Sequence, residues 1–421
     1  MPEKMRVPTL AVDLLFFCAA GLATAALIVA AAMLLQTYEH ARFSRSRRRQ
    51  KPQDRFCPRV ELFVPCKGID SGFRSLVEAV LKQHYPAYAV TFVVESQDDP
   101  AWPCLQERLS QPLALPVRIL VAGHSRGCGQ KVHNLLFATA SLDSSVEVVA
   151  FLDSDVCLPL DWLRLLVQPL QKPSVGAVTG YRWFVPAVDG WSSAVLSALN
   201  GTVALLLGNH PWNGIWGGSW GIRRSTFEAA AIRQAWQGAL TEDYPAWKAI
   251  RKTGLRVVFE PGCLLASPTQ CTWSTLIEFG RRQYLITRVY APGLWWLAFL
   301  GELLFSLAFW GGLALEAGHW LAREGTTWIS LALATLYALA TVRAGFRQSV
   351  ASAMFPEWHD ALCRARILDI WAQPVLSLCN LGLVLMSAFG RRVTWRGIRY
   401  QLDGPEQTQV LSYRRAQEGP E

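Results

Sequence analysis

Residues 146–155 read VEVVAFLDSD, an apolar run of strand length that ends in two aspartates, Asp153 and Asp155. Such a run is typical of a strand buried on both faces of a parallel sheet. Because alternate residues of a strand point the same way, both carboxylates should face one side, at the edge where open α/β sheets bind ligands. This arrangement suits a divalent cation that also holds phosphate oxygens, so Asp153 and Asp155 are candidate ligands for Mg²⁺ or Mn²⁺.

The sequence around this run alternates between strand and helix patterns. Strands are expected at residues 60–64, 90–95, 117–121, 146–152, 176–179 and 256–260. Helical periodicity lies between several of them, at residues 71–83, 130–141 and 161–170. This alternation predicts an α/β domain built on a mostly parallel sheet, with helices on both faces.

Four apolar segments lie outside this domain. The chain has 421 residues, of which 51% are hydrophobic and only 17% charged, which is too apolar for an ordinary soluble enzyme. Residues 14–35 form an uncharged run long enough to cross a bilayer, and Arg-rich sequence rather than a cleavage pattern follows it. Further apolar stretches lie at residues 294–315, 328–342 and 367–389. We therefore expect a multi-pass integral membrane protein.

Basic residues gather directly after the first apolar segment. They are Arg42, Arg45, Arg47, Arg48, Arg49 and Lys51. By the positive-inside rule they place the following domain in the cytosol, most simply at a bacterial inner membrane, and they suit the anionic surface of a lipid bilayer. The net charge of +9 does not indicate nucleic acid, since no aromatic-interleaved basic motif accompanies it. The ten cysteines include no CxxC pair, which fits a reducing compartment.

The C-terminal topology does not balance with three complete spans after a cytosolic domain. Such spans would leave the C-terminus outside, yet an Arg-rich segment, residues 391–399, follows the last one. Residues 367–389 are therefore expected to be re-entrant or interfacial, and residues 190–208 to form an interfacial helix. The predicted organisation is an anchor and basic linker at 1–56, a catalytic domain at 57–290, a membrane region at 291–400 and a polar tail at 401–421.

Two further acidic pairs accompany the first. Asp98 and Asp99 follow a predicted strand and can accept from a uracil N–H or a ribose hydroxyl, or else cap a turn before Pro100. Glu242 and Asp243 lie in LTEDYPAW. Asp243, with Glu242 beside it, is the candidate base that deprotonates an acceptor hydroxyl. The alternative is an acidic helix N-terminus capped by Thr241.

The remaining candidate residues suit a nucleotide or its phosphates. Pro65, Lys67 and Gly68 end the first strand, Lys131 begins a helix, and Gly218 in WGGSW allows close backbone approach to a ligand. Ordinary turns and a solvated surface lysine are the alternatives. A basic and aromatic cluster precedes the next apolar segment and suits a diphosphate grip, or else merely flanks a membrane span. Its members are Arg281, Arg282, Gln283 and Tyr284. Metal–diphosphate binding combined with a base indicates transfer of a sugar from a nucleotide sugar.

The ordered motifs PCKGID, SQDDPA, GQKVHNL, FLDSDV, WGGSW, TEDY and RRQY resemble the ceramide glucosyltransferase-like branch of family 2 glycosyltransferases over roughly residues 58–300. The resemblance implies a cytosolic GT-A domain, which is Rossmann-like, between N-terminal and C-terminal transmembrane helices. It implies inverting transfer from a UDP-sugar, with glucose expected, to the hydroxyl of a membrane lipid such as ceramide or diacylglycerol. The family's aspartates fall on Asp98 or Asp99, on Asp153 or Asp155, and on Asp243, the base. VTWRGIRY, residues 393–400, is similar to the cytosolic sequence that closes membrane-bound family 2 enzymes.

One motif departs from the family pattern. The family reads (Q/R)xxRW where this chain has Gln283 and Tyr284 in place of the Arg–Trp pair, with Arg281 and Arg282 displaced. This departure bears on the acceptor more than on the donor. The alternatives are a processive polysaccharide synthase of the same superfamily, and a non-catalytic membrane protein that retains the fold.

Overall fold

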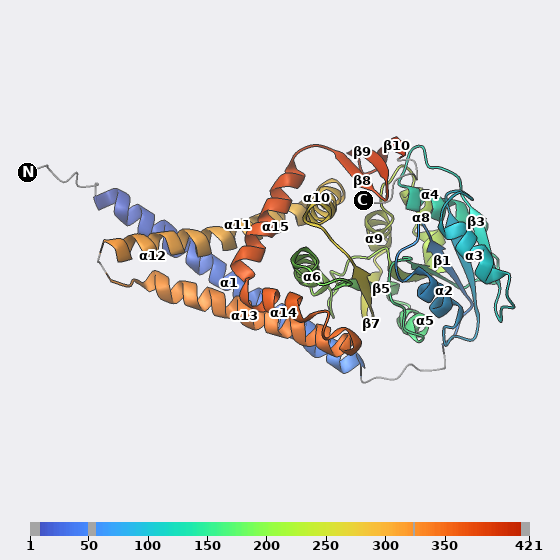
Figure 1. The fold of residues 1–421 in the computed structure, drawn as a ribbon, viewed down its shortest axis with the longest axis horizontal. Coiled ribbons are helices and arrows are strands. Elements are labelled where there is room, and N and C mark those ends of the chain that lie inside the picture. The colour runs from blue at the N-terminus through green and yellow to red at the C-terminus, as the bar shows by residue number, and fades with distance from the viewer. Residues whose placement is uncertain (1–8, 49–55, 323–324, 414–421) are drawn as a thin grey trace, which may run out of the picture.

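The computed structural model describes residues 9–48, 56–322 and 325–413. It has two parts, an elongated arm of long helices and a rounded α/β domain (Figure 1). From residue 9 to residue 413, the chain first passes through the arm, then builds the domain, returns to the arm and finally packs against the domain.

A seven-stranded sheet in the order β3-β2-β1-β4-β6-β5-β7 forms the centre of the domain. Its strands are β1 (Val60–Pro65), β2 (Tyr88–Val94), β3 (Val117–Val121), β4 (Val148–Leu152), β5 (Val175–Pro186), β6 (Ser219–Arg223) and β7 (Arg256–Thr269). Strand β6 is antiparallel to both neighbours, and the other adjacent pairs are parallel. The expected mixed α/β fold with a mostly parallel sheet is thus confirmed.

Three strands differ from the sequence prediction. Strands β5 and β7 continue well beyond the predicted residues 176–179 and 256–260, because they pair with each other as far as Pro186 and Thr269. A Cβ on Gly180 would lie 2.0 Å from the Cys263 carbonyl oxygen, so only glycine lets the two strands approach this closely. Strand β6 was not predicted, since SWGIR is only five residues long and has just two large apolar residues, Trp220 and Ile222.

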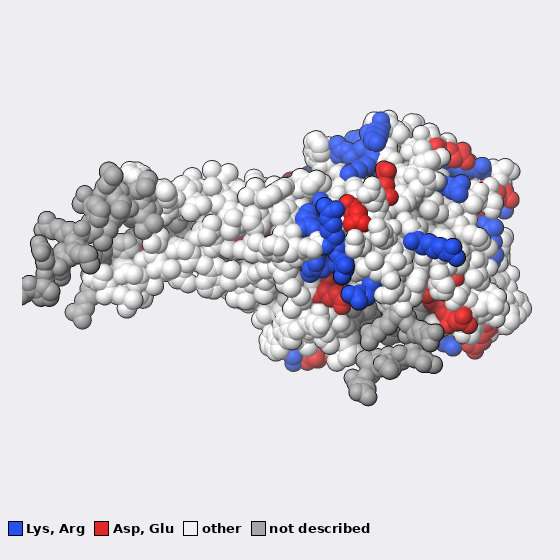
Figure 2. All heavy atoms as spheres, turned by 90° about the horizontal axis from the view of Figure 1, so that it is seen from above, with Lys and Arg blue, Asp and Glu red and all other residues white. Residues whose placement is uncertain are grey.

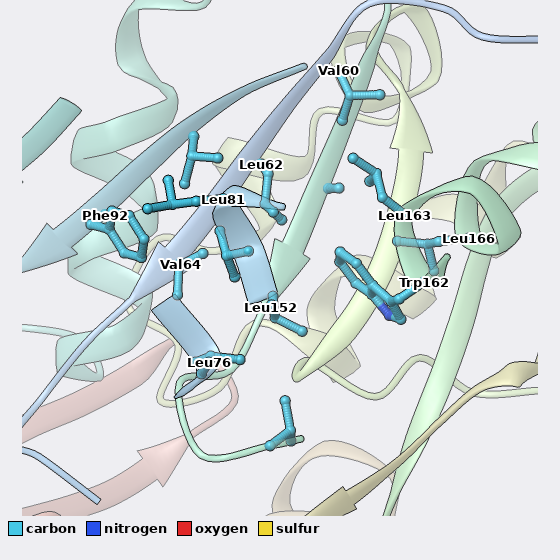
Figure 3. Close-up of a cluster of buried hydrophobic side chains, with 14 of the residues drawn as sticks. Val60, Leu62, Val64, Leu76, Leu81, Phe92, Leu152, Trp162, Leu163 and Leu166 are labelled. Carbon is cyan, nitrogen blue, oxygen red and sulfur yellow. The ribbon is translucent and has the colours of Figure 1, made fainter. Parts of the chain in front are cut away.

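Helices cover both faces of the sheet, as alternate residues of each strand require. On one face α2 (Phe73–Leu81), α3 (Ala101–Leu109) and α5 (Trp162–Val167) pack against β1, β2 and β4. Figure 3 shows part of this core, with Leu62, Phe92 and Trp162 among the labelled side chains. The other face is covered by α4 (Gln130–Ala138), α7 (Arg224–Ala229), α8 (Ile232–Ala235) and α9 (Asp243–Lys252). Burial of each large apolar side chain stabilises the folded state by about 1.5–3 kcal/mol.

Three helices among the described residues are long and apolar enough to cross a membrane, as expected. They are α1 (Thr9–Arg48), the run formed by α11 (Pro292–Ser306), a π-helical turn (Leu307–Gly311) and α12 (Gly312–Leu321), and α13 (Trp328–Met354). The visible face of the arm carries almost no charged side chain, whereas the domain carries many (Figure 2). The arm is therefore the part suited to a bilayer.

Four shorter helices lie between the arm and the sheet (Figure 1). They are α6 (Trp191–Ala204), α10 (Trp273–Tyr290), α14 (Cys363–Trp371) and α15 (Gln373–Ala388). A bend of 92° separates α14 from α15. Pro374, in the first turn of α15, has no N–H to continue the preceding helix. Residues 367–389 are thus a bent pair, which agrees with the prediction that they do not form a plain span.

The described part of the chain ends in a second sheet, so residues 401–413 of the predicted polar tail are ordered strands, whereas residues 414–421 lie outside the described residues. Its strands are β8 (Arg392–Trp395), β9 (Ile398–Gly404) and β10 (Gln407–Tyr413), in the order β10-β9-β8. Tyr400 and Leu402 are buried against Leu240 and Tyr290. The Thr408 N–H also donates to the Gly238 carbonyl at 3.1 Å. Alternating buried positions in a polar segment are a weak signal, and contact with the domain is what stabilises the strands.

Candidate active site

Asp153 and Asp155 follow β4 at the carboxyl end of the parallel strands, as predicted. The Asp153 N–H donates to the Gly218 carbonyl at 3.0 Å, which joins this turn to the segment before β6. A Cβ on Gly218 would lie 2.5 Å from Asp153 Oδ2 and 2.1 Å from the Trp216 ring. Gly218 is therefore required for close packing against the acidic turn.

Two basic side chains hold the Asp153–Asp155 pair. The Arg182 guanidinium contacts Asp153 Oδ2 at 2.7 Å and Asp155 Oδ2 at 3.0 Å, and it lies 4.8 Å from the centre of the Trp216 ring. The Lys131 ammonium contacts Asp153 Oδ1 at 2.5 Å. Burial alone would raise the pKa of Asp155, but Arg182 and Arg396 lower it below its usual value. Asp155 is therefore anionic at neutral pH.

The chemistry of this turn fits a divalent cation. Asp155 Oδ1 is buried and has no hydrogen-bond partner in the part of the chain that the structure describes. A buried carboxylate oxygen without a partner is costly unless a ligand satisfies it. No group of three or more metal-ligating side chains is found among the described residues. The protein can thus offer one or two carboxylates, which is how Mg²⁺ is commonly held together with substrate phosphates.

Lys131 joins this turn to the third acidic pair. Its ammonium contacts Glu242 Oε1 at 2.5 Å as well as Asp153. Burial would lower the pKa of Lys131, but the two carboxylates raise it above its usual value, so Lys131 stays charged. Glu242 is only 1% exposed, and burial raises its pKa to about 7. Gly217 makes room for this carboxylate, since a Cβ there would lie 1.7 Å from Glu242 Oε1.

Asp243 begins α9 and is oriented by two hydrogen bonds. Its Oδ1 accepts from the Thr241 hydroxyl and from the Tyr244 N–H, each at 2.7 Å. Thr241 thus binds the carboxylate and does not cap the helix, whose N-cap is Glu242. Loss of hydration raises the pKa of Asp243, and the two hydrogen bonds partly offset this effect. The Tyr244 ring stacks on the ring of Tyr290 of α10, with 5.8 Å between their centres. Asp243 therefore lies where the domain meets one of the helices between the arm and the sheet.

The predicted nucleotide-contact residues lie together at the ends of β1 and β2. Gly68 has a positive φ of 71°, and its N–H donates to Asp99 Oδ1 at 2.9 Å. Asp99 also accepts from the Ala101 N–H at 2.9 Å, which is the turn-capping alternative. Lys67, two residues beyond Pro65, pairs with Glu95. Asp98 is exposed and is the carboxylate of this pair that is open to a ligand.

The RRQY residues do not converge on the Asp153–Asp155 turn. Arg281 donates to carbonyls at the end of α15 and in β8, and the Tyr284 hydroxyl donates to Asn380 of α15 at 2.7 Å. Arg282 donates to the Thr394 carbonyl at 3.0 Å. Burial lowers the pKa of Arg282 to about 10, with further lowering from Arg396 and Arg182. Gln283 is exposed.

Comparison with known proteins identifies the family. The model of glycosyl transferase family 21 matches residues 22–407 of this chain. The chain belongs to glycosyl transferase family 21.

Two solved structures are similar to this family 21 glycosyltransferase. One is a mannosyltransferase from Pyrobaculum calidifontis in complex with GDP-Man and Mn²⁺, with 16% identity, a TM-score of 0.45, and coverage of 87% of this chain and 97% of that one. The other is glucosyl-3-phosphoglycerate synthase from Mycobacterium tuberculosis in complex with phosphoglyceric acid. It has 14% identity, a TM-score of 0.34, and coverage of 55% of this chain and 79% of that one.

Two arginines of the candidate site were not predicted from the sequence. Arg182 comes from β5 and Arg396 from the connection between β8 and β9. Arg396 contacts Asp70 Oδ1 at 2.9 Å, Asp70 Oδ2 at 2.7 Å and Asp155 Oδ2 at 3.4 Å. A charged residue within the apolar stretch GYRWFV was the available signal for Arg182. For Arg396 the signal was its place in VTWRGIRY.

Proposed function

We propose that this family 21 glycosyltransferase moves a sugar, glucose first, from a UDP-sugar to the hydroxyl of a membrane lipid such as ceramide or diacylglycerol, with inversion. The observation that carries the proposal is Asp243. One of its oxygens is held by Thr241 and Tyr244, and its neighbour Glu242 joins it through Lys131 to the Asp153 turn. An oriented carboxylate beside a metal–diphosphate site is the arrangement that an acceptor base needs.

A lipid acceptor is supported by the surface of the helices between the domain and the arm. Large apolar side chains stand exposed there, among them Trp191 of α6 at 55%, Trp273 of α10 at 56% and Trp371 of α14 at 62%. Exposed apolar residues gathered next to helices of membrane-spanning length favour contact with lipid. We place this surface, the Arg-rich end of α1 and the domain on the cytosolic side, most simply of a bacterial inner membrane.

The proposed roles follow from position. Asp98 and the Pro65–Cys66–Lys67–Gly68 loop contact the nucleoside, and Asp153 and Asp155 hold a Mg²⁺ or Mn²⁺ ion. That ion, when bound, neutralises charge on the departing diphosphate. Lys131 keeps Asp153 and Glu242 in place. Of the RRQY residues, Arg281 and Tyr284 support α15, and Arg282 adds positive potential to the site.

The proposed reaction is a single displacement at the anomeric carbon. Asp243 accepts the proton of the lipid hydroxyl while its oxygen bonds to the anomeric carbon, and the bond from that carbon to the diphosphate breaks with its electron pair leaving on UDP. A single in-line displacement inverts the anomeric centre, so an α-linked donor gives a β-linked product.

The test is transfer of labelled sugar from UDP-glucose to extracted membrane lipids, with and without Mg²⁺ or Mn²⁺. A metal-dependent, chloroform-soluble β-glycolipid is expected, and its mass identifies the acceptor. An α-linked product would overturn the inverting assignment. A labelled polymer would favour the processive synthase. Absence of transfer from UDP-glucose, UDP-galactose and UDP-GlcNAc alike would overturn the proposed donor class.

A further inference from the structure

The connection between β8 and β9 is a tight hairpin of two residues, Arg396 and Gly397. Trp395 pairs with Ile398 across it, and the two central residues have φ values of 49° and 76°. Positive φ at both positions is the signature of a type I′ turn, in which the first residue is seldom an arginine. The strained backbone of this turn therefore places Arg396 at the tip of the hairpin.

The backbone of this hairpin is anchored to the catalytic domain from both sides. The Arg282 guanidinium donates to the Thr394 carbonyl at 3.0 Å, just before the turn. The Tyr400 hydroxyl accepts from the N–H of Gln130, the residue next to Lys131, at 3.2 Å. Since Tyr400 is only 2% exposed, this contact is part of the core. The tip is thus held in a defined place while the long arginine side chain remains free to change its partner.

The partners of Arg396 in the structure are both acidic residues of the site. Its guanidinium grips the two oxygens of Asp70, which lies 326 positions earlier in the chain, and also reaches Asp155 Oδ2 at 3.4 Å. The side chains of Arg396 and Asp70 are 38% and 37% exposed. Ion pairs with this much solvent access contribute little to stability, so a competing anion can replace Asp70 at low cost.

The geometry points to Arg396 as a binding residue for the diphosphate of the donor, exchanging Asp70 for phosphate oxygens when the nucleotide enters. This inference rests on the proposed function and supplies the diphosphate grip that Arg281 does not provide. The planar guanidinium fork that binds both oxygens of Asp70 matches two phosphate oxygens in the same way. Arg182 cannot take this role as readily, because it is committed to Asp153, Asp155 and the Trp216 ring.

The test uses calorimetry to measure the binding of UDP and of uridine to the purified full-length chain in the presence of Mn²⁺. We expect Arg396→Gln to weaken UDP binding about tenfold or more, the usual effect of losing a charged hydrogen-bonding pair, and to leave uridine binding unchanged. Arg396→Lys should recover part of the loss. Arg399→Gln is the matched control, since Arg399 is an exposed arginine of the same strand pair, and it should bind UDP like the parent chain.

A second variant separates ligand binding from support of the hairpin. Asp70→Asn removes the competitor of the diphosphate, so UDP should bind at least as tightly as to the parent chain. Weakened UDP binding in Asp70→Asn, or equal losses for UDP and uridine in Arg396→Gln, would show that the ion pair only braces the fold and would overturn the inference. Undiminished UDP binding in Arg396→Gln would overturn the inference about Arg396 but leave the proposed function standing. A parent chain that binds no UDP would overturn the proposed donor and the inference with it.

Discussion

Lys131 lies 2.5 Å from Glu242 inside the domain, and the same ammonium lies 2.5 Å from Asp153. Burial raises the pKa of Glu242 to about 7, so this carboxylate takes up a proton close to neutral pH. Lys131 therefore links Glu242, which neighbours the proposed base Asp243, to the turn that suits a metal ion.

Replacing Asp243 by asparagine should leave folding and membrane insertion intact but lower turnover by about 10²–10⁴, the usual contribution of a general base. Labelled-lipid formation gives the rate, and thermal unfolding in detergent checks the fold. Asp360→Asn is the control, because that aspartate is fully exposed in the loop before α14. Full activity of Asp243→Asn would remove Asp243 from the mechanism.

Replacing Glu242 by glutamine distinguishes the two candidate bases. Asp243 must be ionised to act, and its pKa is raised, so the rate should increase with pH on the acid side. The neighbouring Glu242 charge opposes ionisation of Asp243, so Glu242→Gln should shift that acid limb to lower pH while retaining activity. A pH–rate profile measures the shift. Loss of all activity at every pH would instead identify Glu242 as the base.

The stability of the parent protein should also depend on pH through Glu242. Glu242 has its pKa raised from 4.5 to about 7, so between these values the folded chain holds a proton that the unfolded chain has released. This group therefore stabilises the fold below about pH 4.5, and its contribution is lost as pH rises towards 7. Glu242→Gln should flatten this dependence in melting curves recorded from pH 5 to pH 8. An identical slope in both proteins would contradict the assigned shift.

Replacing Gly217 by alanine should damage the site, because the new Cβ would lie 1.7 Å from Glu242 Oε1. Such overpacking costs about 1–3 kcal/mol and displaces the carboxylate. We expect a lower melting temperature and a loss of activity of about tenfold or more. Gly214→Ala is the matched control, since nothing lies within 4 Å of its Cβ, and it should behave like the parent chain. Equal behaviour of the two variants would refute the steric argument.

Chelation of divalent cations should abolish transfer, and Mn²⁺ or Mg²⁺ should restore it. If Asp155 is a ligand, Asp155→Asn should weaken Mn²⁺ binding by at least about tenfold, a loss that even outer-shell changes produce. Direct Mn²⁺ titration followed by electron paramagnetic resonance measures this without relying on activity. Asp161→Asn, at an exposed aspartate before α5, should leave the titration unchanged. Transfer that survives chelation would exclude a metal role for this turn.

A buried ion pair between the arm and α14 gives a test of stability alone. The Arg347 guanidinium of α13 binds the Asp369 carboxylate of α14 at 2.5 and 2.8 Å, and neither side chain is exposed. Arg347→Leu leaves an unpaired buried charge and should destabilise the protein by about 3–5 kcal/mol. The double variant with Asp369→Leu should recover much of the loss. A double variant less stable than Arg347→Leu would show that the pair itself, and not the stranded charge, matters.

Much of the fold could be predicted from the sequence because its signals are local. Apolar runs such as residues 146–152 identify the parallel strands, and uncharged runs such as 14–35 identify the membrane helices. Acidic residues that directly follow strands come together at one edge of the sheet, so Asp153 and Asp155 could be named as candidates without a structure. The bend at residues 371–374 was indicated by the interruptions within the segment 367–389.

The α/β sheet, the apolar arm and the position of the acidic residues at strand ends thus follow from local sequence patterns. The partners of those acidic residues depend on the tertiary fold. Arg182 comes from β5, and Arg396 reaches Asp155 across 241 positions of chain. Arg396 lies in a hairpin within residues 291–400, which the sequence assigned to the membrane region. Periodicity records which face of an element is buried, whereas an ion pair depends on how distant elements pack. That packing also turned Arg281 and Tyr284 away from the acidic turn and towards α15.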